Sequence, residues 1–217
     1  MSTRDSYDEV ADLYAEHFLD ELEAKPLDHA LLDLLAAETG DLGPIADLGC
    51  GPGHVARHLH DRGADTLGID LSPRMVELAA EAHPGIGFHV GDMRELHVPD
   101  GAWGGIVAFY SIIHLPPADL PSVFAEFRRV LRPGGQILLS FHLGDEVRHI
   151  DAWWERPVAL DFQFYLRPEI ESALEGAGFT VQAYAERAPY PGEVDTTRAY
   201  LLARRFHRES SFGQEEV

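Results

Sequence analysis

Short apolar runs alternate along the chain with segments whose apolar residues recur three and four positions apart. The runs at about 44–48, 66–70, 86–90, 103–110 and 136–141 have the length of β-strands, and the segments between them have helical spacing. Strands that alternate with helices are typical of βαβ crossovers. The pattern therefore predicts an α/β fold around a mostly parallel sheet.

Several stop and start signals set the expected helix ends. A helix over 54–62 is expected to end at Gly63, and Ser72-Pro73 supplies an N-cap and a first-turn proline for the next helix. A further helix over 120–131 is expected to stop at Pro133-Gly134-Gly135.

The two ends of the chain differ from this central pattern. Residues 7–38 have the spacing of two amphipathic helices, so residues 1–43 are expected to form an N-terminal helical cap. A helix at about 168–176 and apolar runs at 179–184 and 198–203 predict an antiparallel ending to the sheet. The polar segment 205–217 is expected to be a flexible tail.

Residues 143–166 fit neither period and are rich in aromatic side chains. We expect an insertion here that lines an apolar ligand pocket, because aromatic residues bury much area and exclude water. A contact between subunits or a covering flap would explain the composition equally well.

Length and charge narrow the class of protein. A chain of 217 residues fits one domain, 1–217, and the net charge of −20 argues against nucleic acid as a substrate, since affinity for phosphates comes from Lys and Arg. No segment has the apolar length of a signal peptide or a membrane span, which predicts a cytoplasmic protein without membrane contact. Cys50 is the only cysteine. We expect it to be a small apolar residue that packs in the glycine-rich segment, rather than a nucleophile. The sequence neither predicts nor excludes a homodimer.

The most informative segment is Asp47-Leu-Gly49-Cys-Gly51-Pro-Gly53, which follows the first expected strand. Glycine turns sharply there without steric cost, so the backbone can approach a ligand closely. Asp70 ends the second strand about 20 residues after Gly49, a spacing at which an acid takes ribose hydroxyls. A dehydrogenase fingerprint would have glycine where this chain has His54, and no Gly-Lys-Ser/Thr forms a phosphate loop.

With Asp47 before the first glycine, this motif resembles that of the class I S-adenosylmethionine-dependent methyltransferases. Gly91-Asp92-Met93 after the third strand and Leu131-Arg-Pro-Gly-Gly135 before the fifth continue the resemblance from Tyr7 to Arg204. The resemblance implies a Rossmann-like seven-stranded sheet with helices on both faces and the last strand antiparallel. It also implies S-adenosylmethionine as cofactor and methyl transfer to an O, N or C atom of a small organic acceptor.

The resemblance assigns roles residue by residue. It implies that the cofactor's methionine portion, ribose and adenine are held, in chain order, by Tyr7, Tyr14, Asp47, Gly49, Gly51, Asp70, Leu71, Met75, Asp92 and Met93. The two tyrosines would close over the methionine end, although aromatic packing of a helix explains them equally well. Asp92 is also a common turn former at the end of a strand.

Ligands of open α/β sheets bind beyond the carboxyl ends of the strands, which places Tyr110 and His114 nearest the methyl group. An imidazole titrates near neutral pH, so His114 is the first candidate for a general base, with His142 and His149 behind it. The alternatives are a turn-stabilising histidine and a packing tyrosine. No carboxylate stands where metal-dependent catechol methyltransferases place one, so no metal is expected.

Three other functions remain open at this point. They are a cofactor-binding regulatory protein without transferase activity, an enzyme that uses S-adenosylmethionine for a reaction other than methyl transfer, and a nicotinamide dehydrogenase. His54 in place of a third glycine counts against the dehydrogenase.

Overall fold

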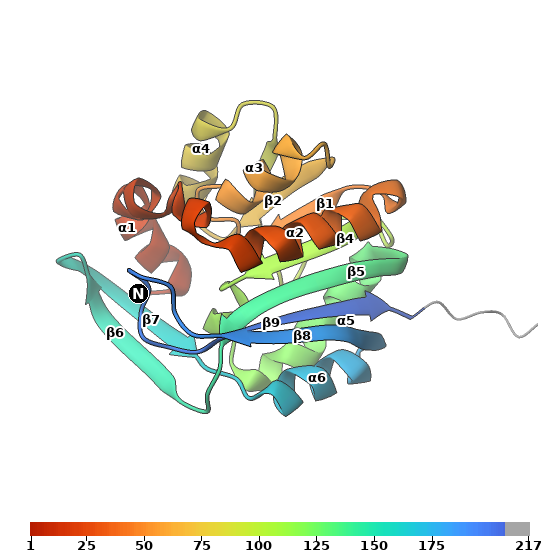
Figure 1. Cartoon of the computed structure of the whole chain (residues 1–217). Helices are drawn as coiled ribbons and strands as arrows, with labels where there is room; N and C mark the ends of the chain where they lie inside the picture. The colour runs from red at the N-terminus through yellow and green to blue at the C-terminus, as the bar shows by residue number, and fades with distance from the viewer. Residues whose placement is uncertain (207–217) are drawn as a thin grey trace, which may run out of the picture.

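A seven-stranded sheet in the order β3-β2-β1-β4-β5-β9-β8 runs through the centre of the computed structural model, which describes residues 1–206 (Figure 1). Its strands are β1 (Ile45–Leu48), β2 (Thr66–Asp70), β3 (Gly87–Val90), β4 (Trp103–Phe109), β5 (Leu131–His142), β8 (Phe179–Arg187) and β9 (Arg198–Arg205). The strands β1 to β5 pair in parallel, and β9 is antiparallel to both of its neighbours. The predicted sheet and its antiparallel last strand are confirmed.

Helices cover both faces of the sheet (Figure 1). They are α1 (Thr3–Phe18), α2 (Pro26–Thr39), α3 (His54–Asp61), α4 (Pro73–Ala82), α5 (Leu120–Val130) and α6 (Arg167–Gly176), with short 3-10 turns η1 (Glu21–Ala24), η2 (Gly40–Leu42), η3 (Ile112–His114) and η4 (Pro117–Asp119). Ser72 caps α4 by accepting a hydrogen bond from the backbone N–H of Met75, as predicted.

Alternate residues of the central strands point to opposite faces of the sheet, and both faces are buried. Ile106 and Leu139 pack with α5 and α6 in one apolar core, and their neighbours Val107 and Leu138 pack with α2 and α3 in another. Because both faces are covered, the ligand-accessible edge is the one where β1 to β5 end.

The insertion at 143–166 is a β-hairpin, which the sequence pattern did not predict. Its strands β6 (Val147–Trp153) and β7 (Arg156–Gln163) pair with each other and lie beside α1 (Figure 1). Val158 and Leu160 of β7 pack against Val10 of α1, and Trp153 and Trp154 border this contact. The hairpin and α1 thus form one cover over the end of the sheet.

Two boundaries also differ from the prediction. Strand β5 begins at Leu131, before the Pro-Gly-Gly segment, and pairs with β4 through a register shift. Strand β9 continues to Arg205, because this residue still pairs with Phe179, so the predicted tail cannot start there. The rest of that tail, 207–217, lies outside the described residues. No helix among the described residues is long and apolar enough to cross a membrane.

Candidate functional site

A cavity of about 530 Å³ lies at the carboxyl ends of β1 to β4, beneath α1 and β7. The predicted cofactor residues and the first catalytic candidates line it: Tyr7, Tyr14, Asp47, Gly49, Gly51, Asp70, Leu71, Met75, Asp92, Met93, Tyr110 and His114. The further base candidates His142 and His149 do not. The structure therefore brings the predicted site together in one place, whereas their individual roles stay predictions.

The glycine turn after β1 requires glycine at its first position. Gly49 has φ +75°, and a Cβ built there would lie 2.3 Å from the Cβ of Ser111, which follows β4. The Ser111 hydroxyl donates a 2.7 Å hydrogen bond to the carbonyl of Leu48, so it cannot move away cheaply. The close approach of two strand ends explains this glycine.

Asp70 fixes the same turn from the neighbouring strand. Its carboxylate accepts hydrogen bonds of 2.8 Å from the backbone N–H groups of Gly51 and Ser72. Each carboxylate oxygen has a second lone pair, so both can still accept from hydroxyl groups of a ligand. Asp70 therefore links the glycine turn to the start of α4 and retains acceptor capacity toward the cavity.

Two acids of the cavity wall lack a basic partner among the described residues. Desolvation raises the pKa of the buried Asp47 to about 7 and raises the pKa of Asp70 as well. Neither forms an ion pair with Lys or Arg within residues 1–206. A cationic ligand would lower both pKa values, so this donor set fits the ammonium and sulfonium of S-adenosylmethionine.

The apolar side chains Leu71, Met75 and Met93 also line the cavity. Asp92 lies beside them and forms an ion pair of 2.6 Å with Arg94, which also donates its backbone N–H. Burial acts to raise the pKa of Asp92, but the hydrogen bonds from Arg94 outweigh it and lower this pKa. Asp92 is thus an ionised acceptor at an apolar slot.

His114 is held on both sides of its ring. Its Nδ1 lies 2.9 Å from the backbone carbonyl of Asp161, which only accepts, so Nδ1 carries the proton. Its Nε2, 2.7 Å from the Tyr7 hydroxyl, therefore accepts from it. Desolvation lowers the pKa of His114 to about 4, so the ring is neutral at pH 7, with its lone pair already engaged.

Tyr110 has an unusual backbone. Its φ of +50° lies in the left-handed region, which costs about 1–3 kcal/mol for a residue with a side chain. Its backbone N–H donates to both the carbonyl (3.0 Å) and the hydroxyl (3.1 Å) of Ser140, which hold this conformation. His142 stacks near Tyr110, with ring centroids 5.2 Å apart, whereas His149 faces Asp161 on the outer hairpin.

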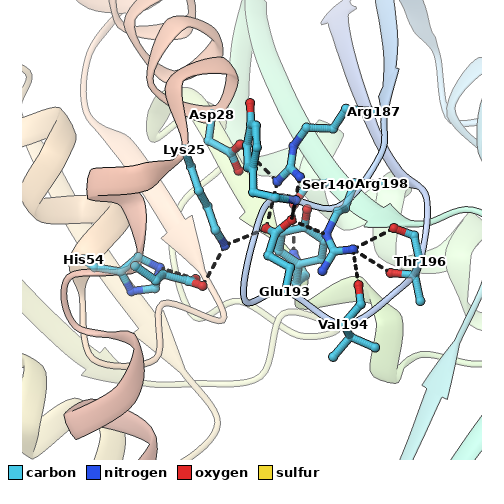
Figure 2. Close-up of polar contacts among 12 residues, drawn as sticks. Lys25, Asp28, His54, Ser140, Arg187, Glu193, Val194, Thr196 and Arg198 are labelled. Carbon is cyan, nitrogen blue, oxygen red and sulfur yellow. Dashed lines mark hydrogen bonds and ion pairs between the residues drawn. The ribbon is translucent and has the colours of Figure 1, made fainter.

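A buried ionic cluster beside Tyr110 escaped the sequence analysis (Figure 2). Glu193, in the β8–β9 loop, accepts from Arg187 at 2.6 and 2.9 Å and pairs with Lys25 at 3.3 Å. The Arg187 side chain also lies 3.4 Å from Asp28, which is 1% exposed. The available signal was Lys25, which is the only lysine of a chain whose 17 basic residues are otherwise arginine.

Comparisons with known proteins identify the family of this chain. A family model described as a methyltransferase domain matches residues 45–135. The N-demethylindolmycin N-methyltransferase of Streptomyces griseus is 30% identical, over 80% of this chain and 84% of that enzyme. The chain belongs to the S-adenosylmethionine-dependent methyltransferases of class I.

Other members of this methyltransferase family are similar over shorter stretches or in fold alone. The malonyl-[acyl-carrier protein] O-methyltransferase of Serratia marcescens is 34% identical over 50% of this chain. The chain spans about half the length of the first such relatives it matches, 42% and 52% for the Serratia marcescens and Yersinia pestis enzymes. A Methanosarcina mazei methyltransferase structure superposes with a TM-score of 0.70 at 16% identity, over 80% of this chain and 97% of that one.

Proposed function

We propose that this methyltransferase transfers a methyl group from S-adenosylmethionine to a small organic acceptor by in-line displacement in the cytoplasm. The observation that carries the proposal is the single cavity lined by all the predicted cofactor residues and by Tyr110 and His114, at the strand ends where ligands of such sheets bind. S-adenosylmethionine, when bound, supplies a methyl carbon that its sulfonium already activates.

The residues of this chain would then bind, orient and exclude water. Asp47 and the turn at Gly49 would face the cationic end of the cofactor, Asp70 its ribose, and Asp92 its adenine. The partly buried Tyr7–His114 pair, covered by α1 and the hairpin, would shield the methyl group from water. Alignment and desolvation of this kind supply much of the rate of a displacement reaction.

Binding and product analysis test this proposal together. Calorimetry with S-adenosylhomocysteine should show saturable binding, and incubation of unlabelled S-adenosylmethionine with a metabolite panel should give a product heavier by about 14 mass units, the mass of CH₂. Tight binding of NADH without binding of S-adenosylhomocysteine would contradict the proposal. A product of unchanged mass would instead indicate a reaction other than methyl transfer.

The affinity for S-adenosylmethionine should rise with pH. Below its pKa of about 7, Asp47 is neutral in the free protein and attracts a cation poorly. Binding must release its proton, so the affinity should fall as pH drops below 7, by up to about tenfold per pH unit. Calorimetric titrations between pH 6 and 8 measure the slope. The Asp47→Asn variant should flatten it, and a flat wild-type profile would contradict the assignment.

A further inference from the structure

A line of hydroxyl groups leads from the cavity wall to a buried carboxylate. The Tyr110 hydroxyl lies 3.2 Å from that of Tyr200, and the Tyr200 hydroxyl lies 3.0 Å from Oδ2 of Asp28. Tyr110 lines the cavity, whereas Tyr200 is 1% exposed and does not. The line therefore connects Tyr110 with Asp28, which borders the same cavity but is only 1% exposed.

The direction of the hydrogen bonds follows from counting protons. A phenol has one proton, and the carboxylate of Asp28 can only accept, so Tyr200 donates to Asp28. The Tyr200 oxygen also accepts from Nε of Arg187 at 2.9 Å and must accept from Tyr110. Every hydroxyl thus donates toward Asp28, and the Tyr110 oxygen keeps a lone pair toward the cavity.

Asp28 has unused acceptor capacity at the end of this line. Its Oδ1 is buried and has no hydrogen-bond partner within residues 1–206, although such groups are nearly always paired. Desolvation raises the pKa of Asp28 in spite of the hydrogen bond from Tyr200 and the charge of Arg187. Arg187 forms an ion pair with Asp28, and Glu193 holds both Arg187 and Lys25 by further ion pairs.

The charges around the cavity favour a cationic acceptor over an anionic one. Carboxylates outnumber lysine and arginine side chains in its wall, where Glu21, Asp28, Asp47, Asp70, Asp92 and Asp161 face Arg4, Lys25 and Arg94. An ammonium group is attracted to such a wall, and an ionised carboxylate is repelled. A protonated nitrogen must lose a proton before its lone pair can attack a methyl carbon.

We infer that Tyr110, Tyr200 and Asp28 form a proton relay that deprotonates an amine acceptor. The ammonium proton passes to the Tyr110 oxygen, the Tyr110 proton to Tyr200, and the Tyr200 proton to Asp28, which becomes a neutral carboxylic acid. The freed nitrogen lone pair then forms a bond to the methyl carbon, and the carbon–sulfur bond breaks with its electron pair on sulfur. The inference rests on the proposed methyl transfer and names its acceptor class.

Tyr200→Phe tests the relay without touching the cavity. It removes one hydroxyl from a buried position, so turnover with amines should fall by about 10²–10⁴-fold, the usual contribution of a positioned proton acceptor. The KM for the amine and the affinity for S-adenosylhomocysteine should stay within about twofold of wild type, because a relay residue acts only in the chemical step. Tyr110→Phe and Asp28→Asn should lose turnover in the same way.

The matched control is Tyr184→Phe, which removes a phenol bonded at 2.7 Å to the carboxylate of Glu186 and outside the cavity wall. It should keep full turnover. The probes are arylalkyl primary and secondary amines and a matched set of arylalkyl carboxylic acids. Thermal unfolding of each variant checks that it is folded.

The outcomes distinguish the proton relay, the inferred acceptor class and the proposed function from one another. Methylation of amines by the wild type, lost in Tyr200→Phe, supports the relay. Methylation of carboxylic acids instead, or of neither probe set in spite of S-adenosylhomocysteine binding, overturns the inferred acceptor class. Wild-type turnover in Tyr200→Phe overturns the relay alone. Absence of S-adenosylhomocysteine binding by the wild type overturns the proposed function itself.

Discussion

Gly49→Ala is expected to weaken cofactor binding by about 30-fold or more. The new methyl group would lie 2.3 Å from Cβ of Ser111, and the φ of +75° is one that alanine adopts poorly. The left-handed backbone costs about 1–2 kcal/mol and overpacking about 1–3 kcal/mol more, and each 1.4 kcal/mol is a tenfold change. Calorimetry with S-adenosylhomocysteine measures the loss of affinity, and thermal unfolding measures the loss of stability.

Gly63→Ala is the matched control for this prediction. Gly63 has φ +85°, but a Cβ there meets nothing within 4 Å. The control variant should therefore lose about 1–2 kcal/mol of stability to backbone strain and keep its cofactor affinity. If Gly49→Ala binds S-adenosylhomocysteine as well as Gly63→Ala does, the turn does not form the cofactor site.

The cofactor side of the cavity could be predicted because its signals are local. Gly49 and Gly51 follow a strand directly, and Asp70 ends the next one, so each residue lies within a few positions of the element that places it. Parallel strands bring their carboxyl ends to one edge, which converts these local signals into a common site. The number of strands and the antiparallel last strand came from the family resemblance, and the strand order was not predicted.

The acceptor side could not be predicted in this way. Tyr200 and Asp28 are 172 positions apart and form one hydrogen bond, and a contact between distant polar side chains leaves no periodic trace in the sequence. His114 was identified as a cavity residue, but its engagement by Tyr7 and Asp161 depends on the cap and the hairpin.

The hairpin was missed for a related reason. Within Val147–Trp153 only Ile150 and Trp153 are even partly buried, so the strand lacks the alternation that marks a strand half-buried in a sheet. Its partner β7 packs Val158 and Leu160 on α1 rather than on the main sheet. A strand that is stabilised mainly by one helix and its hairpin partner therefore does not show the sequence pattern of a strand in the main sheet.

Asp70→Ala is expected to weaken binding of S-adenosylhomocysteine by about 1–3 kcal/mol, roughly 5–150-fold, the range for the loss of a charged hydrogen-bond partner. Part of that loss is structural, because the variant leaves the N–H groups of Gly51 and Ser72 without their 2.8 Å acceptor. A single affinity therefore cannot show that Asp70 holds the ribose.

A thermodynamic cycle isolates the direct contact. Each protein is titrated with methylthioadenosine and with its 2′,3′-dideoxy derivative, which lacks the ribose hydroxyls. If these hydroxyls donate to Asp70, their removal should weaken binding to the wild type far more than binding to Asp70→Ala, since the variant has no carboxylate to lose. Rearrangement of the glycine turn affects both ligands alike and cancels in the comparison. An equal loss in the two proteins would assign Asp70 to the turn alone.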